Sequence, residues 1–127
     1  MDANFTFLVS KILSGEKSQM LCRPTPKWNS VRVGDKLTLY AKHQIGERRK
    51  LGEAIVSDVQ PLIFTDGGII RLDGIADTWL NDYAKLRMAK KNGFSSVEEF
   101  MCSFEEKFGK ESVDILSISW SDFKRTE

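Results

Sequence analysis

One stretch of sequence decides the fold: VGDKLTLYA, residues 33–41. Its Gly-Asp pair is typical of a tight turn, because glycine adopts backbone conformations that other residues rarely adopt. Beyond the turn, Leu37, Leu39 and Ala41 alternate with a threonine and a tyrosine. Side chains at every second position lie on the same face of a strand. The stretch therefore predicts a turn followed by a strand with one buried face.

Further strands are predicted on both sides of this one. A polar loop over residues 42–50 leads into the next strand, and the Asp66-Gly67 pair marks a hairpin. No helical pattern separates successive strands here, so we expect a mixed or mostly antiparallel sheet. These predicted strands cover residues 19–23, 51–59, 61–64 and 69–72.

Helical periodicity appears at the start of the chain and again in its second half. Trp79 and Tyr83 fall on one side of a predicted helix, and a Ser-Ser-Val-Glu-Glu sequence from Ser95 offers a capping box for the next helix. The phenylalanines of that next helix repeat at helical spacing and are expected in the core. The predicted helices cover residues 5–14, 78–91 and 97–108, and a last strand covers residues 113–120.

This order of elements is that of an α+β domain. The length of 127 residues fits one domain, residues 1–127. Many short strands favour a small closed or half-closed β-barrel with flanking helices, since closure removes exposed strand edges.

Composition excludes several classes of protein. A hydrophobic content of 41% with 29% charged residues is typical of a folded domain rather than a disordered chain. No apolar run approaches the roughly 20 residues that cross a membrane, and no secretory signal begins the chain, so we expect a cytoplasmic protein with no membrane partner. One histidine and two cysteines cannot supply a full ligand set for structural zinc, and we expect no metal and no cofactor.

Charge is divided unevenly along the chain. Residues 1–52 carry ten basic and four acidic side chains, whereas residues 53–127 carry nine basic and fourteen acidic ones. Either the basic half offers a surface to an anionic partner, or the two halves attract each other in the folded state. Composition leaves both readings open.

Three motifs follow one another over nearly the whole chain, and each of them alone is only a weak indication of a family. Together they resemble the motifs of the ASCH domain family, which has a PUA-like fold. The family pattern is a helix leading into a Gly-x-Lys motif, then two glycine-containing strand motifs, then a Gly-Phe pair that begins a helix. The matching stretches are residues 12–19 (ILSGEKSQ), residues 33–40 (VGDKLTLY) with 51–56 (LGEAIV), and residues 93–100 (GFSSVEEF).

The resemblance implies a barrel with a cleft that is commonly proposed to bind RNA or nucleotides. Some small members are similar to amidohydrolases that act on N-acetylated cytidine through a lysine, a threonine and a glutamate. Lys17 matches the family's lysine, but Met20 stands at the threonine or glutamate position and Asn92 at the other glutamate position. The arginine position of the motif holds Cys22, with Arg23 displaced by one residue, and a one-residue bulge would restore Arg23.

These departures bear on catalysis. Amide hydrolysis needs an activated nucleophile and a group that moves protons. The thioether of Met20 has no proton to lose, and the amide of Asn92 does not titrate usefully. Lys17 alone would support only a small rate, so we expect binding rather than catalysis.

Four residues near the motifs are the first candidates for ligand binding: Lys17, Gln19, Arg23 and Asn92. A guanidinium can hold a phosphate through two parallel hydrogen bonds, and a glutamine amide can both donate to and accept from a base edge. The alternative for Lys17 is a cation at the negative end of the preceding helix. If these residues form a site, they must converge on one cleft.

Arg48 and Arg49 begin a basic run in the predicted loop over residues 42–50, and Trp28 lies in an earlier loop. Cations interleaved with aromatic rings are typical of single-stranded nucleic acid binding. The alternatives are a solvated basic loop and a tryptophan that plugs one end of the barrel. We favour the plug for Trp28 and leave the basic run undecided.

The leading hypothesis is an RNA- or nucleotide-binding domain with a ligand cleft near Lys17. The alternative is an amidohydrolase or nuclease with a divergent site, which acts on N-acylated cytidine or RNA. A third hypothesis is a protein-interaction domain without a small ligand. Neither the identity of the ligand nor the oligomeric state is predicted.

Overall fold

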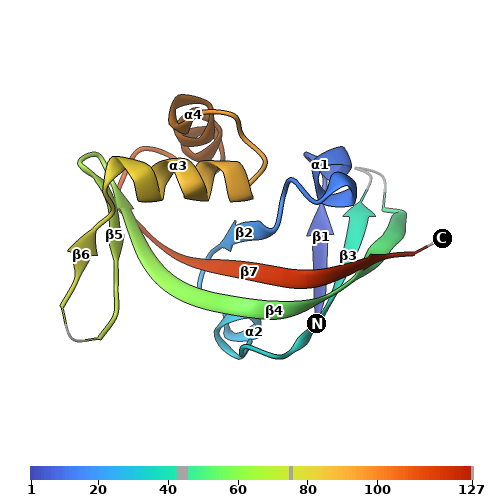
Figure 1. Ribbon diagram of the computed structural model, residues 1–127. Coiled ribbons are helices and arrows are strands. Elements are labelled where there is room, and N and C mark those ends of the chain that lie inside the picture. Colours follow the sequence, from blue (N-terminus) through green and yellow to red (C-terminus); the bar gives the residue numbers. More distant parts are fainter. Residues whose placement is uncertain (43–45, 75, 127) are drawn as a thin grey trace.

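A computed structural model describes residues 1–42, 46–74 and 76–126 of the chain. In this part of the chain, four helices and one seven-stranded mixed sheet form the α+β fold that the sequence predicts (Figure 1). The elements in chain order are β1 (Asp2–Phe5), α1 (Val9–Ser14), β2 (Gln19–Cys22), α2 (Pro26–Asn29), β3 (Lys36–Lys42), β4 (Arg48–Thr65), β5 (Gly68–Arg71), β6 (Thr78–Trp79), α3 (Asp82–Lys91), α4 (Val97–Phe108) and β7 (Val113–Arg125).

The predicted turn and strand at residues 33–41 are confirmed. Gly34 has a φ of 96°, in the left-handed region that favours glycine. The side-chain carboxylate of Asp35 accepts a hydrogen bond of 2.9 Å from the backbone N–H of Arg32, which closes the turn. In β3, Leu37 and Leu39 are fully buried, as the alternation requires.

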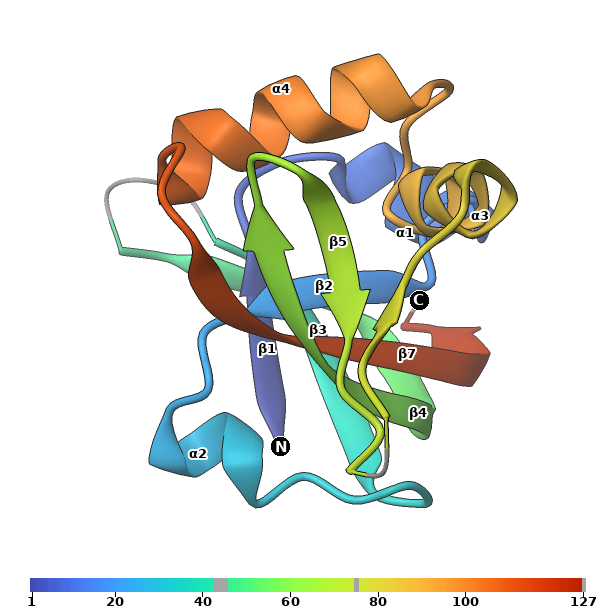
Figure 2. The same ribbon diagram turned by 90° about the vertical axis from the view of Figure 1, so that its left-hand side faces the viewer.

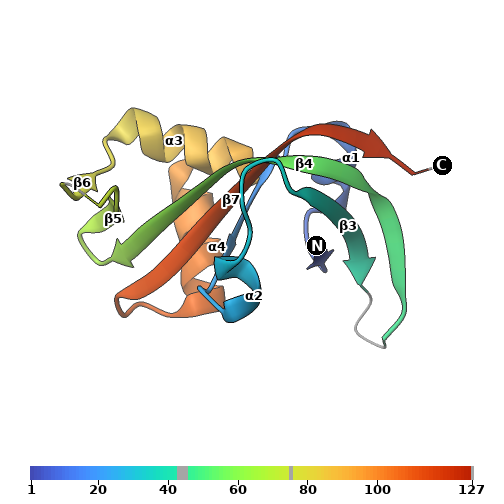
Figure 3. The ribbon, with the colours of Figure 1, turned by 90° about the horizontal axis from the view of Figure 1, so that it is seen from below.

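Two long strands, β4 and β7, run antiparallel through the whole molecule. Their pairing extends from Gly52 opposite Arg125 to Phe64 opposite Val113. The register shifts between Glu53 and Ile55 and again between Val56 and Asp58. Such bulges bend and twist a pair of strands. The two strands lie side by side as they curve across the molecule (Figure 1), and in the view from below they cross because the pair is twisted (Figure 3). Because of this curvature, the same two strands contribute to two different cores.

The curved sheet does not close into a complete barrel. Its strands follow the order β1-β3-β4-β7-β2, and among the described residues β1 pairs only with β3 and β2 only with β7. Both end strands are only four residues long and each is bonded along one edge. Of the two predicted alternatives, the half-closed sheet is therefore the one observed, with an opening between β1 and β2.

The core consists of two apolar clusters. The first fills the curved sheet and receives Ile12 from α1 and Trp120 from β7. Trp28 is partly buried and packs against this cluster. The second cluster lies between the sheet and the two long helices, which cover one side of the sheet (Figure 2), and consists of Leu62, Phe64, Ile69, Ala89, Phe100, Phe104 and Ile115.

The prediction of a helix over residues 5–14 is wrong in its first half. Residues 2–5 form β1, which lies parallel to β3, and the helix begins only at Val9 after Leu8, whose φ is 59°. The ring of Phe5 contacts that of Trp120 with centroids 6.0 Å apart. This long-range packing selects strand over helix, and local periodicity contains no signal for it.

The predicted loop over residues 42–50 and the break at Pro61 are also wrong. Residues 48–50 belong to β4, which continues as one strand through Pro61. On the β5 side, pairing starts only at Leu62, so the missing N–H of the proline interrupts no ladder bond there. Residues 43–45 of the predicted loop lie outside the described residues.

The helix predicted from residue 78 begins later. Thr78 and Trp79 form β6, which pairs with β5, and Asn81 then caps α3 by accepting a hydrogen bond from the N–H of Ala84. Trp79 therefore lies outside the helix that was predicted to contain it, and Trp79 and Tyr83 are 57% and 70% exposed. The short α2 was not predicted either. None of the helices found in the described residues is long and apolar enough to cross a membrane.

Candidate functional site

Three of the four motif residues meet at one point. Lys17 follows Gly15, whose φ of 85° ends α1, and forms an isolated antiparallel bridge with Asn92, the residue that ends α3. The Lys17 Nζ atom donates to the backbone oxygen of Gln19 at 2.8 Å and lies 3.3 and 3.4 Å from the backbone and side-chain oxygens of Asn92. All three residues are buried. The tertiary structure therefore joins positions that are 75 residues apart.

The side-chain amides of Gln19 and Asn92 are hydrogen-bonded to each other beside the lysine. Asn92 Nδ2 donates to Gln19 Oε1 and to the backbone oxygen of Met88, both at 2.8 Å. Gln19 Nε2 donates to Ser119 Oγ on β7 at 2.9 Å. Because these groups bond one another, both amides are engaged within the protein, and the Asn92 side-chain oxygen also contacts the Lys17 amine. The structure thus places Gln19 and Asn92 around the lysine.

A pocket of about 360 Å³ opens beside this cluster, where β1 and β2 remain unpaired with each other. Lys17 and Met20 line one side, and α4 covers another. No aspartate or glutamate belongs to its lining in the described part of the chain, and the only cationic side chains there are Lys17 and Lys107. Six aromatic rings line it: Phe5, Phe7, Phe94, Phe100, Phe104 and Phe108.

Burial changes the chemistry of Lys17. Its side chain makes no ion pair within the described residues. Burial, assisted by the positive charge of Lys107, lowers the pKa of the Lys17 amine from 10.5 to about 7. Near neutral pH this amine is therefore present both as a cation and as a neutral base.

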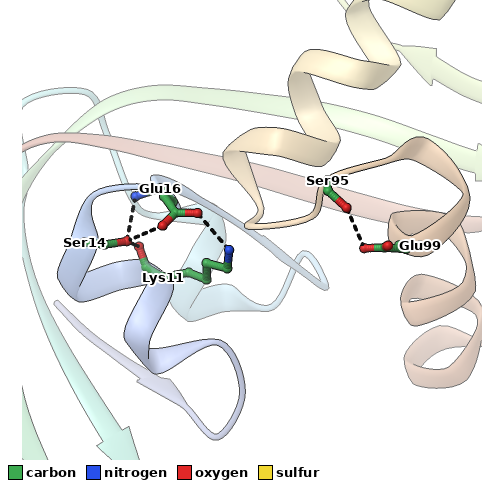
Figure 4. Close-up of polar contacts among 5 residues, drawn as sticks. All are labelled: Lys11, Ser14, Glu16, Ser95 and Glu99. Atoms are coloured by element: carbon green, nitrogen blue, oxygen red, sulfur yellow. Dashed lines mark hydrogen bonds and ion pairs between the residues drawn. The ribbon is translucent and has the colours of Figure 1, made fainter.

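The acid next to Lys17 in sequence does not neutralise it. Glu16 pairs instead with Lys11 on α1 at 2.8 Å and accepts a hydrogen bond of 3.1 Å from Ser14 (Figure 4). After Asn92 in sequence, the Ser95 hydroxyl donates to the carboxylate of Glu99 at 3.1 Å (Figure 4). The acids close to the site in sequence are thus engaged at the surface.

The remaining motif positions are unsuited to acid–base or nucleophilic chemistry. Met20 lies in the pocket wall with a thioether that cannot titrate. Cys22 lies on β2, where burial raises the pKa of its thiol to about 11, so the reactive thiolate is scarce at neutral pH.

The three candidate arginines, Arg23, Arg48 and Arg49, lie in two different places. Arg23 is exposed, and its guanidinium carbon lies 5.2 Å from the ring centroid of Phe108, a pocket residue. Arg48 and Arg49 lie on β4 and are not part of the pocket lining. Arg48 forms an ion pair of 3.2 Å with Asp2 and stacks on a tyrosine ring, so part of the basic run is neutralised within the protein.

Sequence reasoning missed the contribution of α4 to the pocket. Phe100 and Phe104 belong to the core, as predicted, but their rings also line the pocket, together with Lys107. No motif marks Lys107, because it enters the site only through the packing of α4 over the opening between β1 and β2.

No family model matches the chain, and no curated protein sequence does so either. Among solved structures, the chain is similar to the crystal structure of a mutant of ZmASCH from Zymomonas mobilis, with a TM-score of 0.58 and 11% sequence identity. The match covers 98% of this chain and 68% of the other. At this identity the similarity concerns the fold alone, and it agrees with the motif order found in the sequence. The chain therefore shares its fold with ZmASCH, in agreement with the ASCH-like fold that the motif order predicts.

Proposed function

We propose that this protein binds a nucleobase, carried by RNA or by a nucleotide, in the phenylalanine-lined pocket beside Lys17. Aromatic rings stack on bases with a gain of about 1–3 kcal/mol per base. A volume of about 360 Å³ is at the small end of ligand pockets, which suits a single base with its sugar. The pocket opens at an unpaired edge, so a strand of RNA would have room to continue outside it.

The observation that carries this proposal is a buried lysine without an acidic partner. A pKa lowered to about 7 means that the charged amine is disfavoured by roughly 5 kcal/mol relative to a free lysine. A hydrophobic residue would avoid this cost. A ligand that presents a carbonyl, a ring nitrogen or an anionic group to Lys17 Nζ would make use of the amine.

Hydrolysis of N-acylated cytidine or of RNA is the second candidate, and the lowered pKa of Lys17 is what favours it. A lysine that titrates near neutrality can act as a base or a nucleophile. However, no carboxylate lines the described pocket and Met20 stands where a second reactive group is expected. Without a partner to move protons, binding is the better supported function.

The test measures binding of a short fluorescein-labelled single-stranded RNA by fluorescence polarisation at two salt concentrations. We expect binding that weakens with salt, since phosphate contacts release counterions, and a loss of about tenfold or more in Lys17→Met, corresponding to 1.4 kcal/mol or more. The matched control is Lys110→Met, an exposed lysine just beyond α4 that does not line the pocket.

Absence of binding at low salt, or equal binding by the two variants, would contradict the proposal. The same preparations are incubated with N-acetylcytidine and with RNA. Turnover that disappears in Lys17→Met but persists in Lys110→Met would favour the enzyme instead.

A further inference from the structure

Two exposed cations lie close to Phe108, an aromatic ring of the pocket lining, and we call this part of the pocket its mouth. The Nζ atom of Lys107 is 5.1 Å and the guanidinium carbon of Arg23 is 5.2 Å from the ring centroid of Phe108. Lys107 belongs to the last turn of α4, and Arg23 follows the end of β2. Lys107 and Phe108 both line the pocket. Packing of α4 near β2 thus brings together two positive charges that are distant in sequence.

Neither cation is neutralised by the protein. Both side chains are exposed, and within the described residues neither forms an ion pair with a carboxylate. Two groups that are each about 5 Å from one centroid can be at most about 10 Å apart. Both side chains are exposed, so rotation about their torsions toward each other would allow both to bind a single tetrahedral anion, at about 2.8 Å from its oxygens.

The buried amine of Lys17 and the cation of Lys107 at the mouth repel each other. After burial, the positive charge of Lys107 is the second cause of the lowered pKa of Lys17. Three basic side chains, Lys17, Lys107 and Arg23, therefore extend from the interior of the pocket to its mouth, and the described lining contains no acid. An anion at the mouth would relieve the repulsion between Lys107 and Lys17.

We propose that the mouth of the pocket is a phosphate subsite, in which Lys107 and Arg23 bind the phosphate of a nucleotide whose base lies among the phenylalanines. This inference rests on the proposed function and makes it more specific. A guanidinium binds two phosphate oxygens at once, a lysine adds a point charge, and the ring of Phe108 holds both cations near the mouth. The pocket then distinguishes a nucleotide from the nucleoside that lacks its phosphate.

The test compares four ribonucleosides with their 5′- and 3′-monophosphates by isothermal titration calorimetry. For at least one base, we expect the monophosphate to bind about tenfold or more tightly than the nucleoside, a difference of 1.4 kcal/mol or more. Lys107→Gln and Arg23→Gln should each weaken monophosphate binding roughly three- to tenfold, since each removes a charge-assisted hydrogen bond. Both variants should weaken monophosphate binding more than nucleoside binding, and the double variant should lose the preference for phosphate.

The controls remove equal charges elsewhere. Lys110→Gln and Arg87→Gln alter exposed cations outside the pocket lining and should leave the preference intact. Binding of an RNA trinucleotide with and without a 5′-phosphate is measured in the same way. A preference for the phosphorylated trinucleotide would show that the subsite accepts the end of an RNA strand as well as a free nucleotide.

The outcomes separate the two proposals. If nucleosides and monophosphates bind equally, or if the double variant keeps the preference, the phosphate subsite is refuted while the base pocket stands. If no nucleoside, nucleotide or RNA binds, both proposals are refuted. If the control variants weaken monophosphate binding as much as the Lys107 and Arg23 variants do, the effect is one of net charge, and the subsite is refuted.

Discussion

Lys17 is held in the interior by oxygen atoms of neutral groups alone. Its Nζ atom contacts the backbone oxygens of Gln19 and Asn92 and the side-chain oxygen of Asn92, and it lies 5.9 Å from the ring centroid of Phe5. Only the contact with the backbone oxygen of Gln19 is short, at 2.8 Å, and none of these contacts supplies a negative charge. The folded protein therefore binds the proton on this amine more weakly than the unfolded chain does. As a result, the free energy of unfolding must depend on pH.

We predict that the free energy of unfolding rises with pH above neutrality because of Lys17. The unfolded chain keeps the proton up to the ordinary pKa of 10.5, whereas the folded chain releases it near 7, so the unfolded state binds more protons in between. From pH 7 to 8.5 the gain from this one group is about 1.5 kcal/mol. Urea denaturation at several pH values in this window measures it.

Lys17→Met serves as the reference for this prediction, because it removes the titrating group and leaves the others in place. The pH range stops at 8.5 so that the Cys22 thiol, whose pKa is raised to about 11, does not contribute an opposite trend. Equal pH dependence in the wild type and in Lys17→Met would show that the amine is not buried as described.

The sequence could identify only those candidate residues that lie close to a recognisable motif. Lys17, Gln19 and Asn92 were predicted from their places beside glycine-containing motifs, and the structure brings these three together. Arg23 lies at the mouth, on the ring of Phe108. No spacing rule could reveal Lys107, since it approaches the site only through the packing of a helix.

Among the elements, α4 has two functions: one face belongs to the second core and part of the same face lines the pocket. Its start is determined locally. Ser96 accepts a hydrogen bond of 3.2 Å from the backbone N–H of Glu99, which confirms the cap expected near Ser95. Its position over β1 and β2 is determined by long-range packing, including the stack of Phe104 on Phe64 with centroids 3.9 Å apart.

We predict that Ser96→Ala lowers the free energy of unfolding by about 1 kcal/mol, the usual cost of losing an N-cap side chain. Thermal denaturation followed by circular dichroism measures this change. The control is Ser95→Ala, whose hydroxyl bonds only the exposed carboxylate of Glu99 and whose loss should cost less than about 0.5 kcal/mol. Equal effects of the two substitutions would mean that Ser96 does not act as the cap.

The elements that sequence periodicity predicted incorrectly share a cause. Phe5 in β1 and Trp79 in β6 belong to strands that pair with distant or very short partners. A strand of two to four residues has too few positions for its alternation to be recognised, and its stability comes from its partner strand. By contrast, β3 and α4 bury a regular stripe of their own, and the sequence predicted both.

At the scale of the whole molecule, β4 and β7 join the two cores. Ile118 of β7 lies in the first cluster and Ile115 in the second, three residues away on the same strand. The two clusters therefore share a continuous backbone and should unfold together.

We predict that Ile115→Ala lowers the stability of both cores in a single transition, by about 2–5 kcal/mol, the usual cost of removing a buried isoleucine side chain. Near-ultraviolet circular dichroism reports on Trp120 in the first core, and far-ultraviolet circular dichroism reports on the whole fold. The two urea midpoints should shift together, while Asp114→Ala, at an exposed neighbour, should shift neither appreciably. Separate midpoints would show two independently folding parts.

The sequence by itself determined the α+β class, the mixed sheet, the turn and strand at residues 33–41, the cap of α4 and the resemblance to ASCH domains. Each of these is encoded in side chains that are close together along the chain, as a period, a cap or an ordered motif. Only the tertiary structure decided that the sheet stays open between β1 and β2, that Lys17 lies buried among neutral oxygens, and that Arg23 and Lys107 meet on Phe108. These features depend on contacts between residues far apart in sequence, where local patterns have no influence.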